Sequence, residues 1–286
     1  MTSVAFIGAG RLGATLAKAL SRHGMPVVAI ASRSATSATA LAQEIPGCRA
    51  VNADIAAEAD LVFLTVPDDE IGPLAARLPW RAGQRVVHCS GATEVAVLEP
   101  AQRRGALTGG FHPLQIFSDP DRALGLLAGS SVAIEGPAVL EAQLRQIADA
   151  LQMRVIVLPA GARALYHGAA SFAASFLLSM LDEAVAVWGS FGIDEKATLQ
   201  ALLPLARGTL AAAESKGLAG ALAGPVSRGD ASVVARHVAV LDALGPAHGA
   251  LYRELARRQI ALARTGGRVN EERLEALREA IGRPLA

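Results

Sequence analysis

The hydrophobic residues in the first half of the chain follow two alternating patterns. Short runs rich in valine and isoleucine, typical of buried strands, alternate with alanine-rich segments of helical periodicity. This alternation predicts an α/β domain built on a doubly wound, parallel sheet. We expect strands at residues 4–7, 27–31, 61–66, 86–89, 106–110, 131–135 and 154–158, and helices at residues 12–23, 36–44, 69–78, 93–103 and 137–151.

After Pro159 the pattern changes to helices alone, expected at residues 162–189, 194–213, 233–244 and 246–264. We therefore predict a sheet domain over residues 1–159 and an all-α domain over residues 160–286. The most apolar run, residues 169–181, is too short to cross a bilayer. We expect it to be a buried helix, and we expect no membrane partner.

Composition and charge narrow the class of protein. The 286 residues carry a formal net charge of +1, and only 4% are aromatic, which argues against nucleic acid as a partner. Two cysteines are too few for a disulfide framework or a cysteine-based metal site, and no metal is expected. Because no signal-type segment opens the chain, we expect a cytoplasmic protein. The apolar helical domain favours a homodimer formed through the C-terminal helices.

A glycine loop follows the first expected strand and opens the first helix. Residues 8–13 read Gly-Ala-Gly-Arg-Leu-Gly, which matches G-x-G-x-x-G in the context that a dinucleotide site requires. Gly8 permits the tight turn, Gly10 lets a pyrophosphate approach the backbone, and Gly13 lets the helix pack on the strand. An ordinary glycine turn is the alternative. The expected cofactor contacts in this loop are Gly8, Ala9, Gly10, Arg11, Leu12 and Gly13.

The end of the second strand indicates which dinucleotide binds. An NAD site places an acidic residue there, whereas this chain reads Ser32-Arg33-Ser34 and has no acid until Glu44. A guanidinium and two hydroxyls suit a 2′-phosphate, with Arg11 as a second cation, so the expected cofactor is NADP(H). Arg33 as a plain surface residue is one alternative, and a flavin-like cofactor is another. Further along the groove we expect contacts from Val66 and Pro67.

Candidate catalytic residues follow the next two strands, because ligands of an open sheet lie beyond the carboxyl ends of its strands. His112 lies in a segment framed by glycine and proline, and its ordinary pKa suits moving the proton that accompanies hydride transfer. Ser90 would orient the substrate or His112, and Gly91 would contact the substrate. A structural histidine bonded to backbone is the alternative for His112. We expect Asp68 to cap the next helix, and His88 and Cys89 to be core residues.

The whole chain resembles a family of Rossmann-like oxidoreductases with a helical C-terminal domain of unknown function, in the 6-phosphogluconate dehydrogenase-like superfamily. Pyrroline-5-carboxylate reductase and prephenate dehydrogenase are relatives. The resemblance implies a helical dimerisation domain and a substrate site between the domains. Prephenate dehydrogenases have a similar catalytic His-Pro dipeptide and a serine like Ser90. The matching segments are residues 4–13, 32–34, 66–68, 88–91, 111–117, 165–176 and 224–230.

The chain departs from its relatives in the first helix of the second domain. Some relatives use a lysine there with an asparagine four residues later, but this chain has no lysine between residues 18 and 196. His167, Ser171 and Ser175 share one helical face instead, as either a polar stripe toward substrate or a helix contact. Ser175 stands where the family usually has asparagine. Arg228 is a candidate for binding a substrate carboxylate, and Asp230 is expected to cap a helix.

Two functions remain open at this stage. The first is an NADP(H)-dependent oxidoreductase that acts on a small polar or anionic molecule. In it, His112 would be the acid or base, and Ser90 its partner or an orienting donor. His167 would be a further catalytic residue that contacts the substrate, and Ser171, Ser175 and Arg228 would be substrate contacts. The second is a sensor or regulatory protein that binds a nicotinamide dinucleotide without catalysis.

Overall fold

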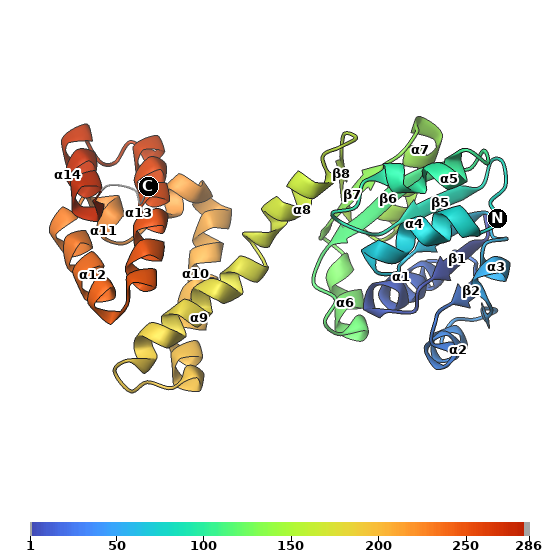
Figure 1. The fold of residues 1–286 in the computed structure, drawn as a ribbon, viewed down its shortest axis with the longest axis horizontal. Helices are drawn as coiled ribbons and strands as arrows, with labels where there is room; N and C mark the ends of the chain where they lie inside the picture. The colour runs from blue at the N-terminus through green and yellow to red at the C-terminus, as the bar shows by residue number, and fades with distance from the viewer. Residues whose placement is uncertain (1, 283–286) are drawn as a thin grey trace. The chain divides into compact units, whose positions relative to one another are not determined.

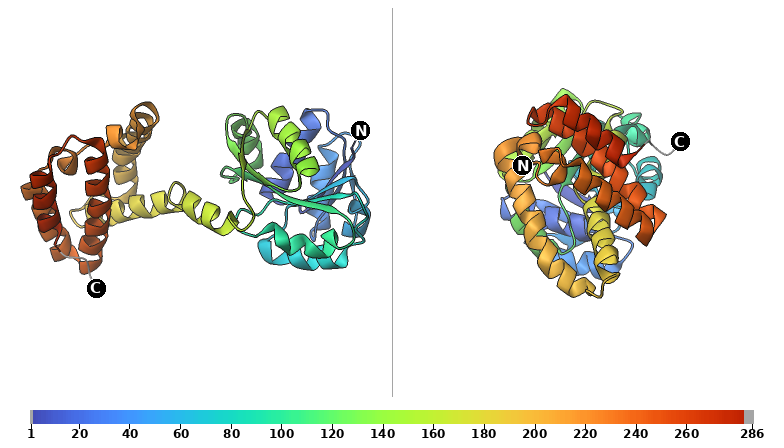
Figure 2. Two further views of the ribbon diagram at one scale, coloured as in Figure 1. Left: turned by 90° about the horizontal axis from the view of Figure 1, so that it is seen from above. Right: turned by 90° about the vertical axis from the view of Figure 1, so that its left-hand side faces the viewer.

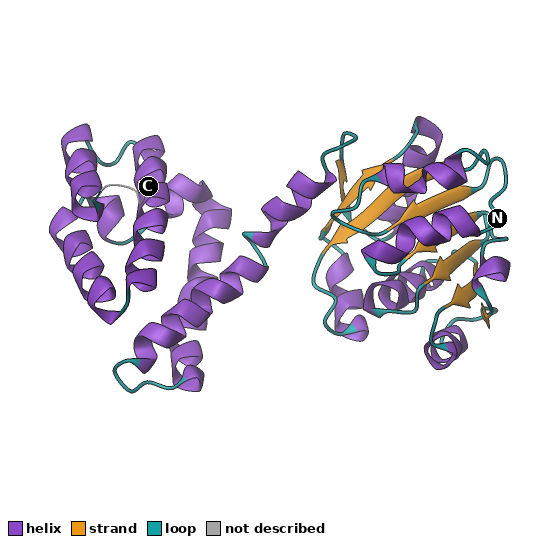
Figure 3. Ribbon diagram, viewed as in Figure 1, coloured by secondary structure: helices purple, strands orange, loops and turns teal. Residues whose placement is uncertain are grey.

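The computed structural model describes residues 2–282. Contacts divide the chain into two compact units, Met1–Ser171 and Phe172–Ala286. The first holds every strand of the described chain, and the second is helical throughout (Figure 3). The domain boundary that we predict at residues 159 and 160 rests on where the strands end and stays a prediction.

The first unit is built on an eight-stranded sheet with the order β3-β2-β1-β4-β5-β6-β7-β8 (Figure 1). Neighbouring strands are parallel except β6 and β7, which pair antiparallel. The predicted fold class is confirmed, with the correction that the sheet is mixed. The strands are β1 (Val4–Ile7), β2 (Val27–Ala31), β3 (Arg49–Ala50), β4 (Leu61–Leu64), β5 (Arg85–His88), β6 (Leu107–Leu114), β7 (Ser131–Glu135) and β8 (Arg154–Val157).

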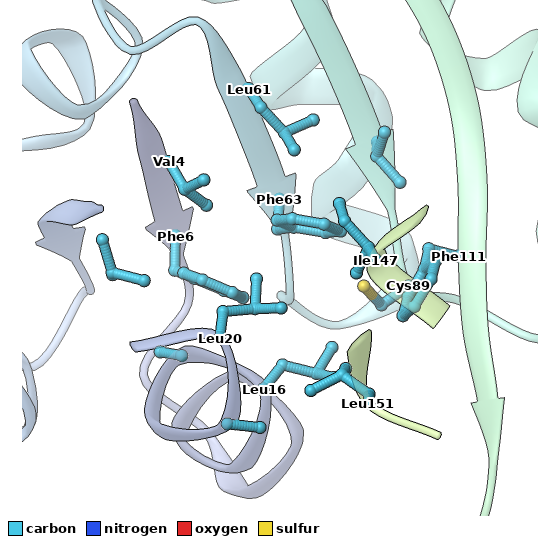
Figure 4. Close-up of a cluster of buried hydrophobic side chains, with 14 of the residues drawn as sticks. Val4, Phe6, Leu16, Leu20, Leu61, Phe63, Cys89, Phe111, Ile147 and Leu151 are labelled. Atoms are coloured by element: carbon cyan, nitrogen blue, oxygen red, sulfur yellow. The ribbon is translucent and has the colours of Figure 1, made fainter. Parts of the chain in front are cut away.

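Helices cover both faces of this sheet (Figure 2), so the inner strands are apolar on both sides. On the face of α1 and α7, Phe6 stacks on Phe63 with ring centroids 5.0 Å apart, and Cys89 packs in the same core as predicted (Figure 4). The other face packs on α4 and α5. The helices are α1 (Arg11–Arg22), α2 (Ala35–Gln43), α3 (Ala53–Ala56), α4 (Asp68–Arg77), η1 (Val95–Leu98), α5 (Glu99–Gln102), α6 (Pro120–Leu127), α7 (Ala138–Ala150) and α8 (Arg163–Ser171).

Strand β6 is longer than its sequence predicts, and this changes the setting of His112. The pairing of β6 with β5 ends at Gly110, but its pairing with β7 continues through His112 and Pro113 to Leu114. Pro113 lies past the last residue of β6 that pairs with β5. A proline, which lacks an N–H group, therefore leaves no hydrogen bond to β5 unmade at this position. His112 therefore lies in a strand and not in a loop, which holds its imidazole more rigidly.

The second unit comprises α9 (Ser175–Gly189), α10 (Glu195–Ala221), α11 (Pro225–Arg228), α12 (Ala231–Leu244), α13 (Pro246–Gly266) and α14 (Glu271–Ile281). Its core lies among α12, α13 and α14, around Val234, Ile260 and Leu274. The long helix expected at residues 162–189 is interrupted at residues 172–174, where Ala174 has φ −121° and ψ −90°.

Helix α9 buries none of its residues, so the expectation of a buried helix is wrong. By length and composition alone, the stretch Arg163–Gly189 is long and apolar enough to cross a membrane, because an 18-residue window within it has a mean hydropathy of 1.5. Its first turn nevertheless holds the fully buried Arg163 and the half-buried Tyr166, which contact Glu135 and His112 of the sheet. The expectation of no membrane partner stays a prediction.

Candidate functional site

The glycine loop lies between β1 and α1, against the end of β4. Gly8 has φ +118°, and a Cβ on it would lie 2.2 Å from the carbonyl oxygen of Thr65. A Cβ on Gly13 would lie 2.2 Å from the carbonyl oxygen of Gly8, which also accepts a hydrogen bond from Thr65 Oγ1 at 2.7 Å. A Cβ on Gly10 would meet nothing within 4 Å. The fold thus needs glycine at positions 8 and 13. Of the three glycines in the loop, only Gly10 borders open space, which a pyrophosphate needs in order to approach the backbone closely.

Gly10 is also the N-cap of α1, and it provides no side chain to bond the free N–H groups of the first turn. That turn contains no acidic residue. The N-terminus of α1 therefore keeps its partial positive charge available for an anion.

A cavity of about 500 Å³ opens beside this loop. It brings together eight predicted cofactor contacts, namely Gly8, Ala9, Gly10, Ser32, Arg33, Ser34, Val66 and Pro67. The other three, Arg11, Leu12 and Gly13, do not line it, and the side chain of Arg11 is exposed to solvent. Arg77 at the end of α4 lines the cavity in its place as the second cation. Sequence reasoning missed Arg77 because it lies far from the glycine loop along the chain.

The loop after β2 carries the groups expected to select the cofactor. Arg33 is 80% exposed and forms an ion pair with Glu70 of α4 at 3.1 Å. Ser34 caps α2 by accepting from the N–H of Ser37 at 3.2 Å, and the Ser37 hydroxyl lies 3.0 Å from the Ser34 oxygen. The cavity thus offers a guanidinium and a cluster of hydroxyls, but it also contains the carboxylate of Glu70.

A second polar cluster lies past the end of β5, beside the last residues of β6. His112 Nδ1 is 3.1 Å from the hydroxyl of Tyr166 on α8, and its ring meets that of His167 edge-on with centroids 5.6 Å apart. Gly91 lies between the two histidines, because a Cβ there would be 2.4 Å from His167 Nδ1 and 2.8 Å from His112 Nε2. The predicted residues His112, His167 and Gly91 therefore meet, and Tyr166 joins them. The tyrosine precedes His167 in the sequence, which is the one signal that could have identified it.

Ser90 organises the turn after β5. Its hydroxyl donates to Asp68 at 2.7 Å and accepts from the N–H groups of Ala92 and Thr93. Asp68 therefore does not cap α4, which begins at Asp68 itself after Pro67. Ser90 is bonded to Asp68 rather than to His112, and its expected role toward substrate stays a prediction.

Burial changes the acid–base chemistry of this cluster. Burial, together with the neighbouring His167 and Arg163, lowers the pKa of His112 from 6.5 to about 4. Burial likewise lowers the pKa of His88, a core residue as predicted, to about 3 and raises the pKa of Tyr166. At neutral pH His112 is thus a neutral imidazole and Tyr166 a phenol, so the histidine would relay a proton and the tyrosine is the better direct donor.

Comparison with known proteins places both halves of the chain. Residues 1–113 match the family model of a Rossmann-like domain, and residues 130–259 match that of a domain of unknown function, DUF2520. The chain is a Rossmann-like protein with a DUF2520 domain. None of the curated proteins matches it. His112 comes from the Rossmann-like region, whereas Tyr166 and His167 come from the DUF2520 region.

Solved structures share this fold over most of the chain. Protein TM1727 from Thermotoga maritima has a TM-score of 0.76 at 24% identity, covering 92% of this chain and 98% of that one. The "putative NADP oxidoreductase BF3122" from Bacteroides fragilis has a TM-score of 0.70 at 28% identity, covering 90% and 97%. A reductive aminase from Aspergillus terreus in complex with NADPH and ethyl-5-oxohexanoate has a TM-score of 0.61 at 18% identity, covering 98% and 92%.

The remaining predicted residues lie in the DUF2520 region. Ser171 ends α8 and Ser175 begins α9 after the interruption, so the expected continuous face of His167, Ser171 and Ser175 is broken there. Arg228 Nε donates to Asp230 at 2.8 Å. Asp230 therefore holds this guanidinium rather than capping α12. Substrate contacts by Ser171, Ser175 and Arg228 stay predictions. Within residues 2–282 no group of three or more histidine, cysteine or acidic side chains could hold a metal ion.

Proposed function

We propose that this protein is an NADP(H)-dependent oxidoreductase that transfers hydride to or from a small polar or anionic substrate. One observation carries the proposal: the cofactor cavity and the pair of His112 and Tyr166 lie along the same edge of one sheet. The cavity borders the ends of β2, β1 and β4, and the pair lies past the end of β5, where His112 belongs to the last part of β6. A dinucleotide with its 2′-phosphate near Arg33 and its pyrophosphate at Gly10 would extend toward that pair.

The residues of the second cluster would move the proton of the reaction. The bound cofactor supplies or accepts the hydride. Tyr166 would donate its hydroxyl proton to the carbonyl oxygen or imine nitrogen that is being reduced, and would recover a proton from His112 Nδ1. His167 would then link His112 to solvent. In the oxidation direction, the same groups would take the proton away.

The neutral donors support a particular substrate class. A phenol next to a neutral imidazole suits protonation of a polar C=O or C=N group, which supports a small ketone, keto acid or imine. The fold shared with a reductive aminase and an imine reductase from a Pseudomonas species supports including imines.

The test is NADPH consumption with a panel of keto acids, cyclic imines, and ketones with and without an amine. Tyr166→Phe should lower kcat by about 10² to 10⁴-fold while NADPH affinity is kept. Tyr252→Phe is a matched control, because its hydroxyl also bonds a histidine, His237 Nδ1 at 2.9 Å, outside the candidate site. Tight NADPH binding without turnover of any class would favour the sensor, and full activity of Tyr166→Phe would refute the proton donor.

We also propose that two copies associate through the helical unit. Large apolar side chains on α9 and α10 support this, since Leu178 is 68% exposed, Leu205 66% and Leu210 60%. Light scattering of the wild-type protein should give the mass of a dimer, and Leu178→Glu with Leu205→Glu should give a monomer. A monomeric wild-type protein at micromolar concentration would refute this proposal. The cytoplasmic location remains a prediction of the sequence.

A further inference from the structure

The first turn of α8 is tied to the sheet unit by buried polar contacts that the reaction itself does not use. Arg163 is fully buried, and its Nε donates to the carboxylate of Glu135 on β7 at 2.8 Å. Its Nη1 donates to the carbonyl oxygen of Ser90 at 2.8 Å. The guanidinium lies directly over Gly110, where a Cβ would be 1.8 Å from Nη2. A glycine is needed at this position because the arginine occupies the space of its side chain.

A second acid holds the same turn from the other side. The carboxylate of Glu94 accepts from the N–H groups of Gly161 at 3.1 Å, Arg163 at 3.0 Å and Ala164 at 3.4 Å. A carboxylate from elsewhere in the chain thus bonds the free N–H groups at the start of α8, where the helix dipole favours negative charge. We define Glu94, Glu135 and Arg163 as the α8 anchor.

The position of the anchor determines which side chains face His112. Residues three and four apart lie on the same face of a helix, so Tyr166 and His167 share the face of Arg163. Both side chains contact His112. Gly110 lies two residues before His112 in β6. Fixing Arg163 over Gly110 therefore also holds the hydroxyl of Tyr166 against the imidazole of His112. Loss of the anchor would let the turn move while the rest of the sheet stays in place.

We propose that the α8 anchor is a positioning device that holds Tyr166 and His167 against His112. Only the expected effect on turnover rests on the proposed function. Within residues 2–282, Arg163 does not line the cofactor cavity and forms no hydrogen bond with Tyr166. It therefore acts by fixing the first turn of α8. The same device keeps His112 away from water and beside a positive charge. The groups that face His112 are Tyr166, His167 and Arg163 from α8, Asp68 from α4 and His88 from β5.

The test compares Arg163→Met and Glu94→Ala with wild type, and uses Glu99→Ala as a matched control. Glu99 belongs to the segment that follows Glu94, but within residues 2–282 its side chain pairs only with Arg103, on the surface, at 3.2 Å. Histidine NMR between about pH 5 and 8 follows His112, whose signal is assigned from a His112→Gln variant. Wild-type His112 should stay neutral over this range, and both anchor variants should titrate within it because water reaches the ring.

The kinetic arm of the test uses NADPH turnover. Both anchor variants should lose about 100-fold in kcat with unchanged NADPH affinity, since a displacement of about 1 Å has such an effect. If Arg163→Met does not fold, Glu94→Ala carries the test, because it leaves no buried charge unpaired. A folded anchor variant with wild-type His112 titration, or a shift of equal size in Glu99→Ala, would overturn the proposal. If wild type turns nothing over, the proposed function fails while the titration still decides the anchor.

Discussion

The three glycines of the loop provide a sharp test of the cofactor site, because they differ in what surrounds them. A methyl group on Gly13 would lie 2.2 Å from the Gly8 carbonyl oxygen and 2.6 Å from Thr65 Oγ1. The loop or α1 would have to move by about 1 Å, and such overpacking costs about 1–3 kcal/mol. In a unit of this size that lowers Tm by about 3–10 °C. The Gly13→Ala variant should therefore unfold at a measurably lower Tm than the wild-type protein.

Gly10→Ala should behave in the opposite way. Its Cβ would meet nothing within 4 Å, and its φ of −76° is open to any residue. The loss of stability should stay below about 1 kcal/mol. The methyl group would, however, occupy the space that a pyrophosphate needs to reach the N–H groups of α1. Losing one such charge-assisted hydrogen bond costs about 1.5–3 kcal/mol, which weakens NADPH binding by about 10- to 150-fold.

Two measurements distinguish these outcomes: thermal unfolding by circular dichroism, and titration of each variant with NADPH followed by fluorescence. Gly125→Ala in α6 is the control, because its Cβ also meets nothing within 4 Å and it does not line the cofactor cavity. It should bind NADPH like wild type. Wild-type NADPH affinity in Gly10→Ala would refute our reasoning about the cavity, and wild-type stability in Gly13→Ala would refute our reasoning about the packing.

Further predictions concern charge. Arg33→Asp should weaken NADPH far more than NADH, whereas the same change at the surface residue Arg103 should affect neither; equal losses for both cofactors would contradict the 2′-phosphate assignment. Glu70→Gln should tighten NADPH binding about 2- to 5-fold in the same titration, because it removes a carboxylate beside Arg33. The folded pKa of His112, about 4, lies below its unfolded value of 6.5. This histidine therefore contributes stability above pH 6.5 that is lost as the pH falls toward 4, about 3 kcal/mol in all. Urea unfolding across that range should show the loss, and His112→Gln should reduce its slope; an unchanged slope would show that burial of His112 is not its cause.

The cofactor half of the candidate site could be predicted from sequence because it is local. The turn, the bare helix N-terminus and the end of β2 follow from short stretches of chain, and the cavity contains eight of the predicted residues. Arg77 and Glu70 were not predicted, because they reach the cavity from α4 and no local sequence pattern indicates which way their side chains point. The continuous helix through Ser175 was predicted wrongly because helical periodicity does not reveal a break among small residues.

The sequence by itself determined the strand–helix alternation, the glycine loop and the change to helices after the last strand, because each depends on periodicity or on backbone freedom within a few residues. Only the tertiary structure decided the surroundings and the charge of His112 at neutral pH. Its lowered pKa arises from burial beneath α8, and its partner Tyr166 is 54 positions away along the chain. In the sequence, Arg163 cannot be distinguished from the other arginines, most of which are expected at the surface. Burial and long-range pairing depend on how distant segments pack, and here they make His112 a buried, neutral imidazole at neutral pH. No local pattern encodes that change.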